Sequence, residues 1–138
     1  MDKAIITKKI EELELYLKEL ERLKILTLDD IKKSKEKAWS VEHGLQLSIQ
    51  IVIDVGNHIL ASISENQIED YADIIDKLGE HSIVPIEFAE KIRDMAGFRN
   101  ILVHDYIKLD LSRLYDILQN RLGDFKQFIE YIKKYIKI

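Results

Sequence analysis

Residues 95–106 read Met-Ala-Gly-Phe-Arg-Asn-Ile-Leu-Val-His-Asp-Tyr, and they are the most informative part of the chain. Phe88, Ile92 and Met95 are spaced as one face of a helix, and Arg99 falls on the next position of that face. An arginine on a buried face must find a partner or line a polar cleft, because an unpaired buried charge is costly. The spacing therefore predicts a helix that carries Arg99 to a buried polar contact or to a cleft.

His104 and Tyr106 follow Arg99 within the same stretch. His104 lies five residues after Arg99, which is roughly 140° around an unbroken helix. If the helix ends or loosens near His104, the imidazole can turn back toward Arg99. The side chains of Arg99, His104 and Tyr106 can then converge on one anion.

Apolar residues recur at helical spacing through most of the chain, with only five glycines and one proline among 138 residues. This pattern predicts an all-α antiparallel bundle of about five to six helices in a single domain over residues 1–138. The expected helices are one that ends near Lys24, one capped by Thr27 with Asp30 in its first turn, one from Lys35 to Ser62, one from Ile68 to Leu78, one that begins at Pro85, and one capped by Asp110.

The expected third helix has two stripes. The apolar stripe should face the core, and Gly56 on it should mark a close helix crossing, since glycine costs roughly 1 kcal/mol there relative to alanine. This stripe contains Val41, Leu45, Ile49, Val52, Ile59 and Ile63. The second stripe is polar and contains Gln46, Gln50, Asp54 and Asn57.

Two interpretations of the polar stripe stay open. It is either a solvated face, or a face turned toward a partner subunit or toward the cleft that holds Arg99. In the second case Asp54, with Asn57 nearby, can orient Arg99 or His104, because carboxylates commonly fix the tautomer of a working imidazole. His58 either joins that cleft or has a surface or packing role.

Composition limits the other possibilities. No cysteine is present, so disulfides and thiolate metal sites are excluded. No His-Glu-x-x-His motif, calcium loop or glycine-rich phosphate loop occurs, so no metal or cofactor is expected. No apolar run is long enough for a membrane span and no signal peptide begins the chain, which favours the cytoplasm. The net charge of −4 means that any contact with a polyanion such as a nucleic acid is local.

A helix that carries Arg-x4-His-x-Tyr resembles the HEPN superfamily of small all-helical proteins. Within it, Arg99, His104 and Tyr106 match the HepT-type toxin ribonucleases without a gap, and Ile53–His58 is similar to the third-helix signature of that subfamily. Those ribonucleases pair with a minimal nucleotidyltransferase antitoxin of the MntA type. The resemblance extends over nearly the whole chain.

The resemblance implies a toxin that is a metal-independent endoribonuclease acting on tRNA or mRNA. Arg99 and His104 are then the catalytic residues, and Asn100 and Tyr106 bind the substrate. The resemblance also implies that the partner nucleotidyltransferase transfers AMP to Tyr106 and so silences the enzyme. One histidine cannot easily be both acid and base, so we expect a two-fold homodimer with two motifs facing each other, as in HEPN ribonucleases.

Two other functions are compatible with the same residues. One is a non-catalytic HEPN-like module that binds a nucleotide or docks a minimal nucleotidyltransferase while RNA stays intact. The other is a purely structural helical dimer, in which Arg99→Ala would lower stability more than any activity.

Overall fold

The chain folds into a bundle of helices in a computed structural model that describes residues 1–104 and 110–138. Over these residues no strand is found, and no helix is both long and apolar enough to cross a membrane. The helices are α1 (Lys3–Leu23), α2 (Leu28–Lys33), α3 (Lys35–Ser62), α4 (Tyr71–Glu80), α5 (Ile86–Ile92), α6 (Asp94–His104), α7 (Leu111–Asn120) and α8 (Leu122–Ile136).

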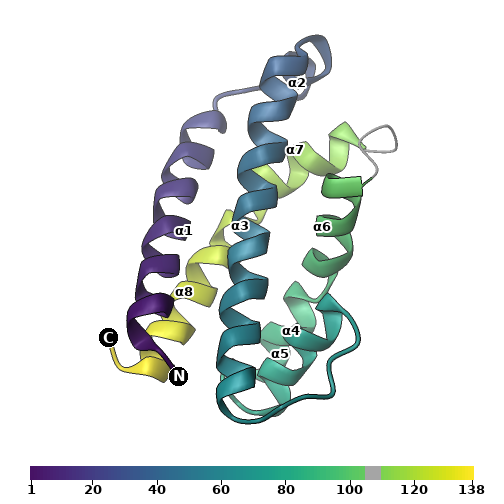
Figure 1. The fold of residues 1–138 in the computed structure, drawn as a ribbon. Coiled ribbons are helices and arrows are strands. Elements are labelled where there is room, and N and C mark those ends of the chain that lie inside the picture. Colours follow the sequence, from purple (N-terminus) through teal and green to yellow (C-terminus); the bar gives the residue numbers. More distant parts are fainter. Residues whose placement is uncertain (105–109) are drawn as a thin grey trace.

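The long helices α1 and α3 run antiparallel, side by side, and α8 returns along α1 so that both chain termini lie at the same end (Figure 1). On the other side of α3, helices α4 and α6 pack against it, and α5 packs against α4. The all-α antiparallel bundle predicted from the sequence is confirmed.

Helix α3 is the centre of the bundle. Its middle is buried on all sides, since Ile51, Val52 and Ile53 are exposed by only 4%, 1% and 2%. A Cβ atom added at Gly56 would lie 2.8 Å from Cγ2 of Ile74. Helices α3 and α4 therefore cross closely at Gly56, and the predicted close crossing is confirmed. The prediction for Ile63 was wrong: its side chain is 39% exposed, because it follows the last turn of the helix.

Local caps define several helix ends. The Thr27 hydroxyl accepts from the backbone N–H of Asp30 at 3.1 Å, and the Asp30 carboxylate accepts from the backbone N–H of Thr27 at 2.9 Å. Asp110 caps α7 as predicted. Helix α4 begins at Tyr71 rather than at Ile68, because Asp70 caps it by accepting from the backbone N–H of Asp73.

The structure breaks two of the predicted helices. The helix expected from Pro85 is divided into α5 and α6 at Arg93, and the last helix is divided into α7 and α8 at Arg121. Arg121 leaves the helical conformation at φ −121° and ψ 6°. The apolar stripe continues across this position, so periodicity alone could not show the break.

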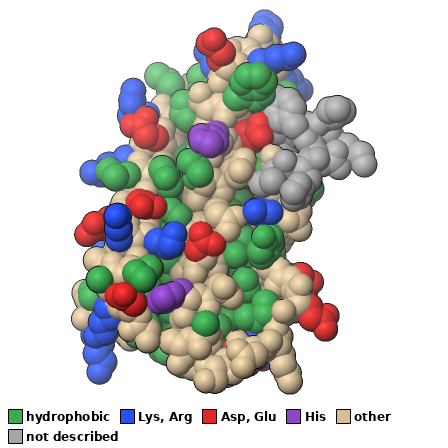
Figure 2. All heavy atoms as spheres, in the orientation of Figure 1, with side chains coloured by type: hydrophobic (Ala, Val, Ile, Leu, Met, Phe, Trp, Pro, Cys, Tyr) green, Lys and Arg blue, Asp and Glu red, His purple; other side chains and the backbone are tan. Residues whose placement is uncertain are grey.

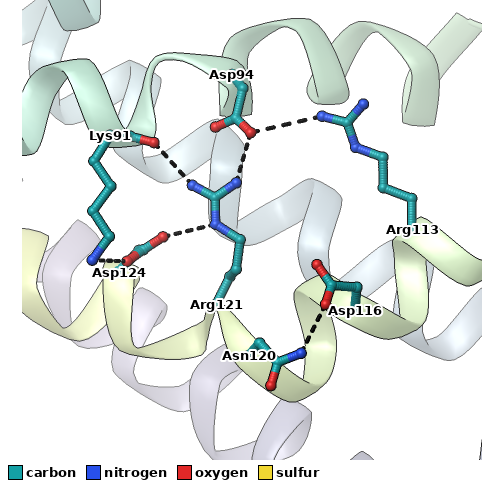
Figure 3. Close-up of polar contacts among 7 residues, drawn as sticks. All are labelled: Lys91, Asp94, Arg113, Asp116, Asn120, Arg121 and Asp124. Atoms are coloured by element: carbon teal, nitrogen blue, oxygen red, sulfur yellow. Dashed lines mark hydrogen bonds and ion pairs between the residues drawn. The ribbon is translucent and has the colours of Figure 1, made fainter.

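A network of charged side chains surrounds the break at Arg121 (Figure 3). The guanidinium donates to Asp94 at 2.7 Å, to Asp124 at 2.9 Å and to the carbonyl oxygen of Lys91 at 3.1 Å. The hydrogen bond to Asp94 is the main cause that raises the pKa of Arg121 above its ordinary value. Since Asp94 is the first residue of α6, this network ties the start of that helix to the junction of α7 and α8.

The contact between Glu65 and His81 links the loop after α3 to the end of α4 and predicts a pH effect. Nε2 of His81 lies 3.0 Å from a carboxylate oxygen of Glu65, and this hydrogen bond lowers the pKa of Glu65 below its ordinary 4.5. A lowered folded pKa adds stability above the unfolded pKa, and that stability is lost as the pH falls through the folded value. In Glu65→Gln, the free energy of unfolding should therefore fall less steeply with decreasing pH below about pH 4.5. Urea unfolding at several pH values from pH 7 to pH 3 measures this dependence. The control Glu87→Gln replaces an exposed glutamate and should show the wild-type dependence of the free energy of unfolding on pH. The same dependence in all three proteins would contradict the prediction.

Candidate functional site

Arg99 is held in place by α3. Its side chain is half-buried, and its Nε donates to Oε1 of Gln50 at 3.0 Å. Nε2 of Gln50 in turn donates to a carboxylate oxygen of Asp54 at 2.8 Å. The Gln50 amide is thereby fixed with its oxygen toward Arg99, because its nitrogen is engaged by the carboxylate.

The ring of Tyr71, the first residue of α4, lies beside the same guanidinium. The Arg99 guanidinium carbon is 4.8 Å from the centroid of the Tyr71 ring, which is within the range of a cation–π contact. Arg99 on α6 therefore contacts side chains of α3 and α4 together. These two contacts leave the guanidinium little freedom to turn away.

Asp54 contributes to the site through Gln50 rather than by direct contact with Arg99. Its other carboxylate oxygen lies 3.7 Å from Nζ of Lys9, and both side chains are partly exposed, so this ion pair is weak. The interpretation of the polar stripe as a face turned toward Arg99 is thus supported at Gln50 and Asp54. Of the two interpretations of His58, the structure supports the packing role, because its Nε2 accepts a hydrogen bond from the backbone N–H of Asp2.

A cleft of about 540 Å³ opens beside Arg99 between α3, α4 and α6. Gln50 and Tyr71 line it, and both also contact Arg99. The predicted residues Asp54, Asn57 and Asn100 line it as well. Asn100 is exposed, and its side-chain oxygen lies 3.5 Å from Nη1 of Arg99, at the limit of a hydrogen bond.

His104 is the last residue of α6, and nothing is described of its side chain. Tyr106 lies outside the described residues. The predicted convergence of Arg99, His104 and Tyr106 therefore stays a prediction. Arg99 is in the middle of α6, and His104 is the last residue of the helix, roughly 1.4 turns further along it.

The surface around the site is mixed in charge. On the face seen in Figure 2, acidic and basic side chains alternate over the described residues, without an extended basic patch. Among residues 1–104 and 110–138 no three His, Asp or Glu side chains are grouped to hold a metal ion. An anion at this site would depend on Arg99, which has guanidinium donors in a fixed geometry.

Two residues of the site were not predicted as site residues from the sequence. Gln50 belongs to the polar stripe of α3, so its helical register with Asp54 was a usable signal. Tyr71 had no such signal, because its contact with Arg99 depends on how α4 packs.

Comparisons with known proteins show which proteins this chain resembles in sequence and in fold. A tRNA nuclease HepT from Aphanizomenon flos-aquae is 28% identical over 136 residues, which cover 99% of this chain and 92% of the relative. An mRNA nuclease HepT from Shewanella oneidensis is 33% identical over 94 residues, covering 68% of this chain and 71% of the relative. A solved structure of the tri-AMPylated Shewanella oneidensis HEPN toxin in complex with MNT antitoxin is similar with a TM-score of 0.86 at 28% identity, covering 97% of this chain and 99% of that one.

The family described as Ribonuclease HepT-like matches residues 5–132, from the first turn of α1 to the last turns of α8. The match includes every residue of the cleft and the whole of α6. Because the family model covers nearly the whole chain, the chain belongs to the HepT-like ribonuclease family.

Proposed function

We propose that this protein is the toxin of a toxin–antitoxin pair: a metal-independent endoribonuclease that cleaves RNA in the cytoplasm and is neutralised by a partner nucleotidyltransferase. The observation that carries the proposal is the Arg99 guanidinium, held at the cleft by Gln50 and Tyr71. Relatives named as tRNA and mRNA nucleases, and a solved HEPN toxin in complex with MNT antitoxin, support the substrate and the partner.

The proposed reaction is an internal transesterification of RNA. The ribose 2′-oxygen bonds to the adjacent phosphorus and gives its proton to a base, the bond from phosphorus to the 5′-oxygen breaks, and that oxygen takes a proton from an acid. The products are a 2′,3′-cyclic phosphate end and a free 5′-hydroxyl. His104 serves in proton transfer, since the unperturbed pKa of histidine is near the working pH. Arg99 stabilises the charge that develops on the non-bridging oxygens.

A homodimer completes this site. A neutral imidazole can accept the 2′-proton while a second, protonated imidazole donates to the leaving oxygen, and each chain supplies one His104. Two copies of α6 facing each other across a two-fold axis would bring both histidines to one phosphate.

Regulation is proposed at Tyr106. The partner nucleotidyltransferase would join the phenolic oxygen of Tyr106 to the α-phosphorus of ATP, with pyrophosphate as the leaving group. The new phosphodiester would add an anion two residues after His104 in the sequence, and this anion would compete with RNA for Arg99. The tri-AMPylated state of the similar Shewanella oneidensis toxin supports this regulation.

The decisive experiment is incubation of the purified, unmodified protein with total RNA and with tRNA in the presence of EDTA. We expect cleavage that leaves cyclic phosphate ends, and loss of cleavage after treatment with the partner enzyme and ATP. Intact RNA from a folded, unmodified dimer would overturn the proposal and favour the non-catalytic docking module.

Gln50 is a positioning residue for Arg99, and its replacement should slow the reaction. Gln50→Leu removes a hydrogen bond worth about 1–1.5 kcal/mol and should lower kcat about tenfold. Gln50→Glu keeps an acceptor for Arg99 but places a second carboxylate beside Asp54, so it should restore only part of the rate. The readout is kcat and KM on one RNA substrate. Equal kcat values for wild type and Gln50→Leu would show that Gln50 does not position Arg99.

A further inference from the structure

The cleft beside Arg99 has an apolar floor that the cleavage step does not use. Ile53 and Ile74 on this floor are exposed by only 2% and 4%, and Ile68 beside them is half-buried. The half-buried Tyr71 adds an aromatic ring. The volume of about 540 Å³ is that of a small-molecule site, for which roughly 300–1,000 Å³ is usual. A flat, largely apolar ring is the kind of group that such a floor accommodates.

The rim of the same cleft is acidic. Asp54, Glu69 and Asp70 line it together with the amides of Asn57 and Asn100. Ionised carboxylates accept hydrogen bonds and cannot donate them, and they repel a phosphate. The occupant of the cleft must therefore be a ring that presents N–H donors at its edge and carries no negative charge of its own.

The position of the cleft relates this ring to the phosphate. Gln50, Tyr71 and Asn100 each contact Arg99 and line the cleft, so the guanidinium lies at the edge of the cleft. The hydrogen bonds to Gln50 and Asn100 engage Nε and Nη1, so among the described residues Nη2 is left for an anion. One nucleotide can thus place its phosphate on Arg99 and its base in the cleft.

We propose that this cleft binds the nucleobase next to the scissile phosphate and selects bases by their N–H donors, with guanine preferred and uracil disfavoured. Guanine presents neighbouring imino and amino donors that can bond to one carboxylate, whereas uracil presents one imino group between two carbonyl oxygens, which the carboxylates repel. The proposal rests on the proposed function, because it assigns the specificity of that site.

Binding of nucleotides to the unmodified full-length chain tests the proposal without relying on cleavage. In calorimetric titrations, guanosine 3′-monophosphate should bind at least fivefold more tightly than uridine 3′-monophosphate. Glu69→Gln and Asp70→Asn should reduce this ratio to below twofold, since each removes a rim carboxylate without touching Arg99, and asparagine can still cap α4. Glu87→Gln, an exposed glutamate on α5 outside the cleft, is the matched control and should keep the ratio.

Cleavage of RNA oligonucleotides that differ only in the base next to the cut provides the second arm. Wild type should cut after guanine at least fivefold faster than after uracil, and the two rim variants should lose that preference. Equal binding of the two nucleotides by wild type, or a preference that persists in both variants, would overturn the cleft proposal. If wild type cleaves no RNA but binds the guanine nucleotide selectively, the proposed ribonuclease function fails while the base site stands.

Discussion

Arg99→Ala should lower the rate of RNA cleavage by roughly two to three orders of magnitude, as loss of a preorganised donor to a developing oxyanion does in other enzymes. The reason is geometric: Gln50 and Tyr71 hold the guanidinium at the cleft before RNA binds. The free energy of unfolding should fall by only about 1 kcal/mol, the usual net contribution of one hydrogen bond. Initial rates on one RNA substrate and a urea unfolding curve measure the two effects separately.

Two further variants test whether the loss of activity is due to the guanidinium of Arg99 and the imidazole of His104. Arg99→Lys keeps the charge but loses the planar set of donors, so it should restore less than about a tenth of the wild-type rate. His104→Ala should be as inactive as Arg99→Ala, because without an imidazole the proton transfers lose their catalyst. A large loss of stability with little loss of activity in Arg99→Ala would instead favour the purely structural role of the arginine.

Arg121→Ala should be the most destabilising change outside the apolar core, at about 2–3 kcal/mol. Asp124 is only 5% exposed, and removing Arg121 takes away the guanidinium Nε that donates to it, together with one partner of Asp94. The expected loss is smaller than that of a fully buried pair, because Nζ of Lys91 stays 3.0 Å from Asp124 (Figure 3). Thermal and urea unfolding measure the change.

A surface pair supplies the matched control. Arg22 lies 2.9 Å from Glu19 with both side chains largely exposed, so Arg22→Ala should change stability by less than about 1 kcal/mol. The double variant Arg121→Met with Asp124→Leu should recover much of the lost stability, since an apolar pair carries no desolvation cost. Equal losses in Arg121→Ala and Arg22→Ala would mean that the network does not stabilise the helix junction.

The sequence predicted the parts of the fold that depend on local chemistry. The Thr27–Asp30 capping box and the close crossing at Gly56 were predictable, because each depends on a residue type at a particular position of a helix. The break at Arg121 was not, since the apolar stripe continues across it. That break lies where Arg121 pairs with Asp94, 27 residues away in the chain.

The candidate site was also predictable from the sequence only in part. Helical register on α6 placed Arg99 at a buried polar contact, and register on α3 grouped Gln50 with Asp54. The identity of the partner depended on the packing of α6 against α3, which joins residues 49 apart. The roles of His104 and Tyr106 stay predictions, because the His104 side chain and Tyr106 lie outside what the structure describes.

The contacts of Arg99 also determine when its conformational entropy is lost. A free arginine side chain loses about 2 kcal/mol of rotamer freedom when it is immobilised. Here Gln50 and Tyr71 restrict the side chain when the protein folds, so that cost is met mainly by the free energy of folding rather than by substrate binding. An enzyme whose surface neutralises few phosphates can thus use more of its limited binding energy on the reacting phosphate.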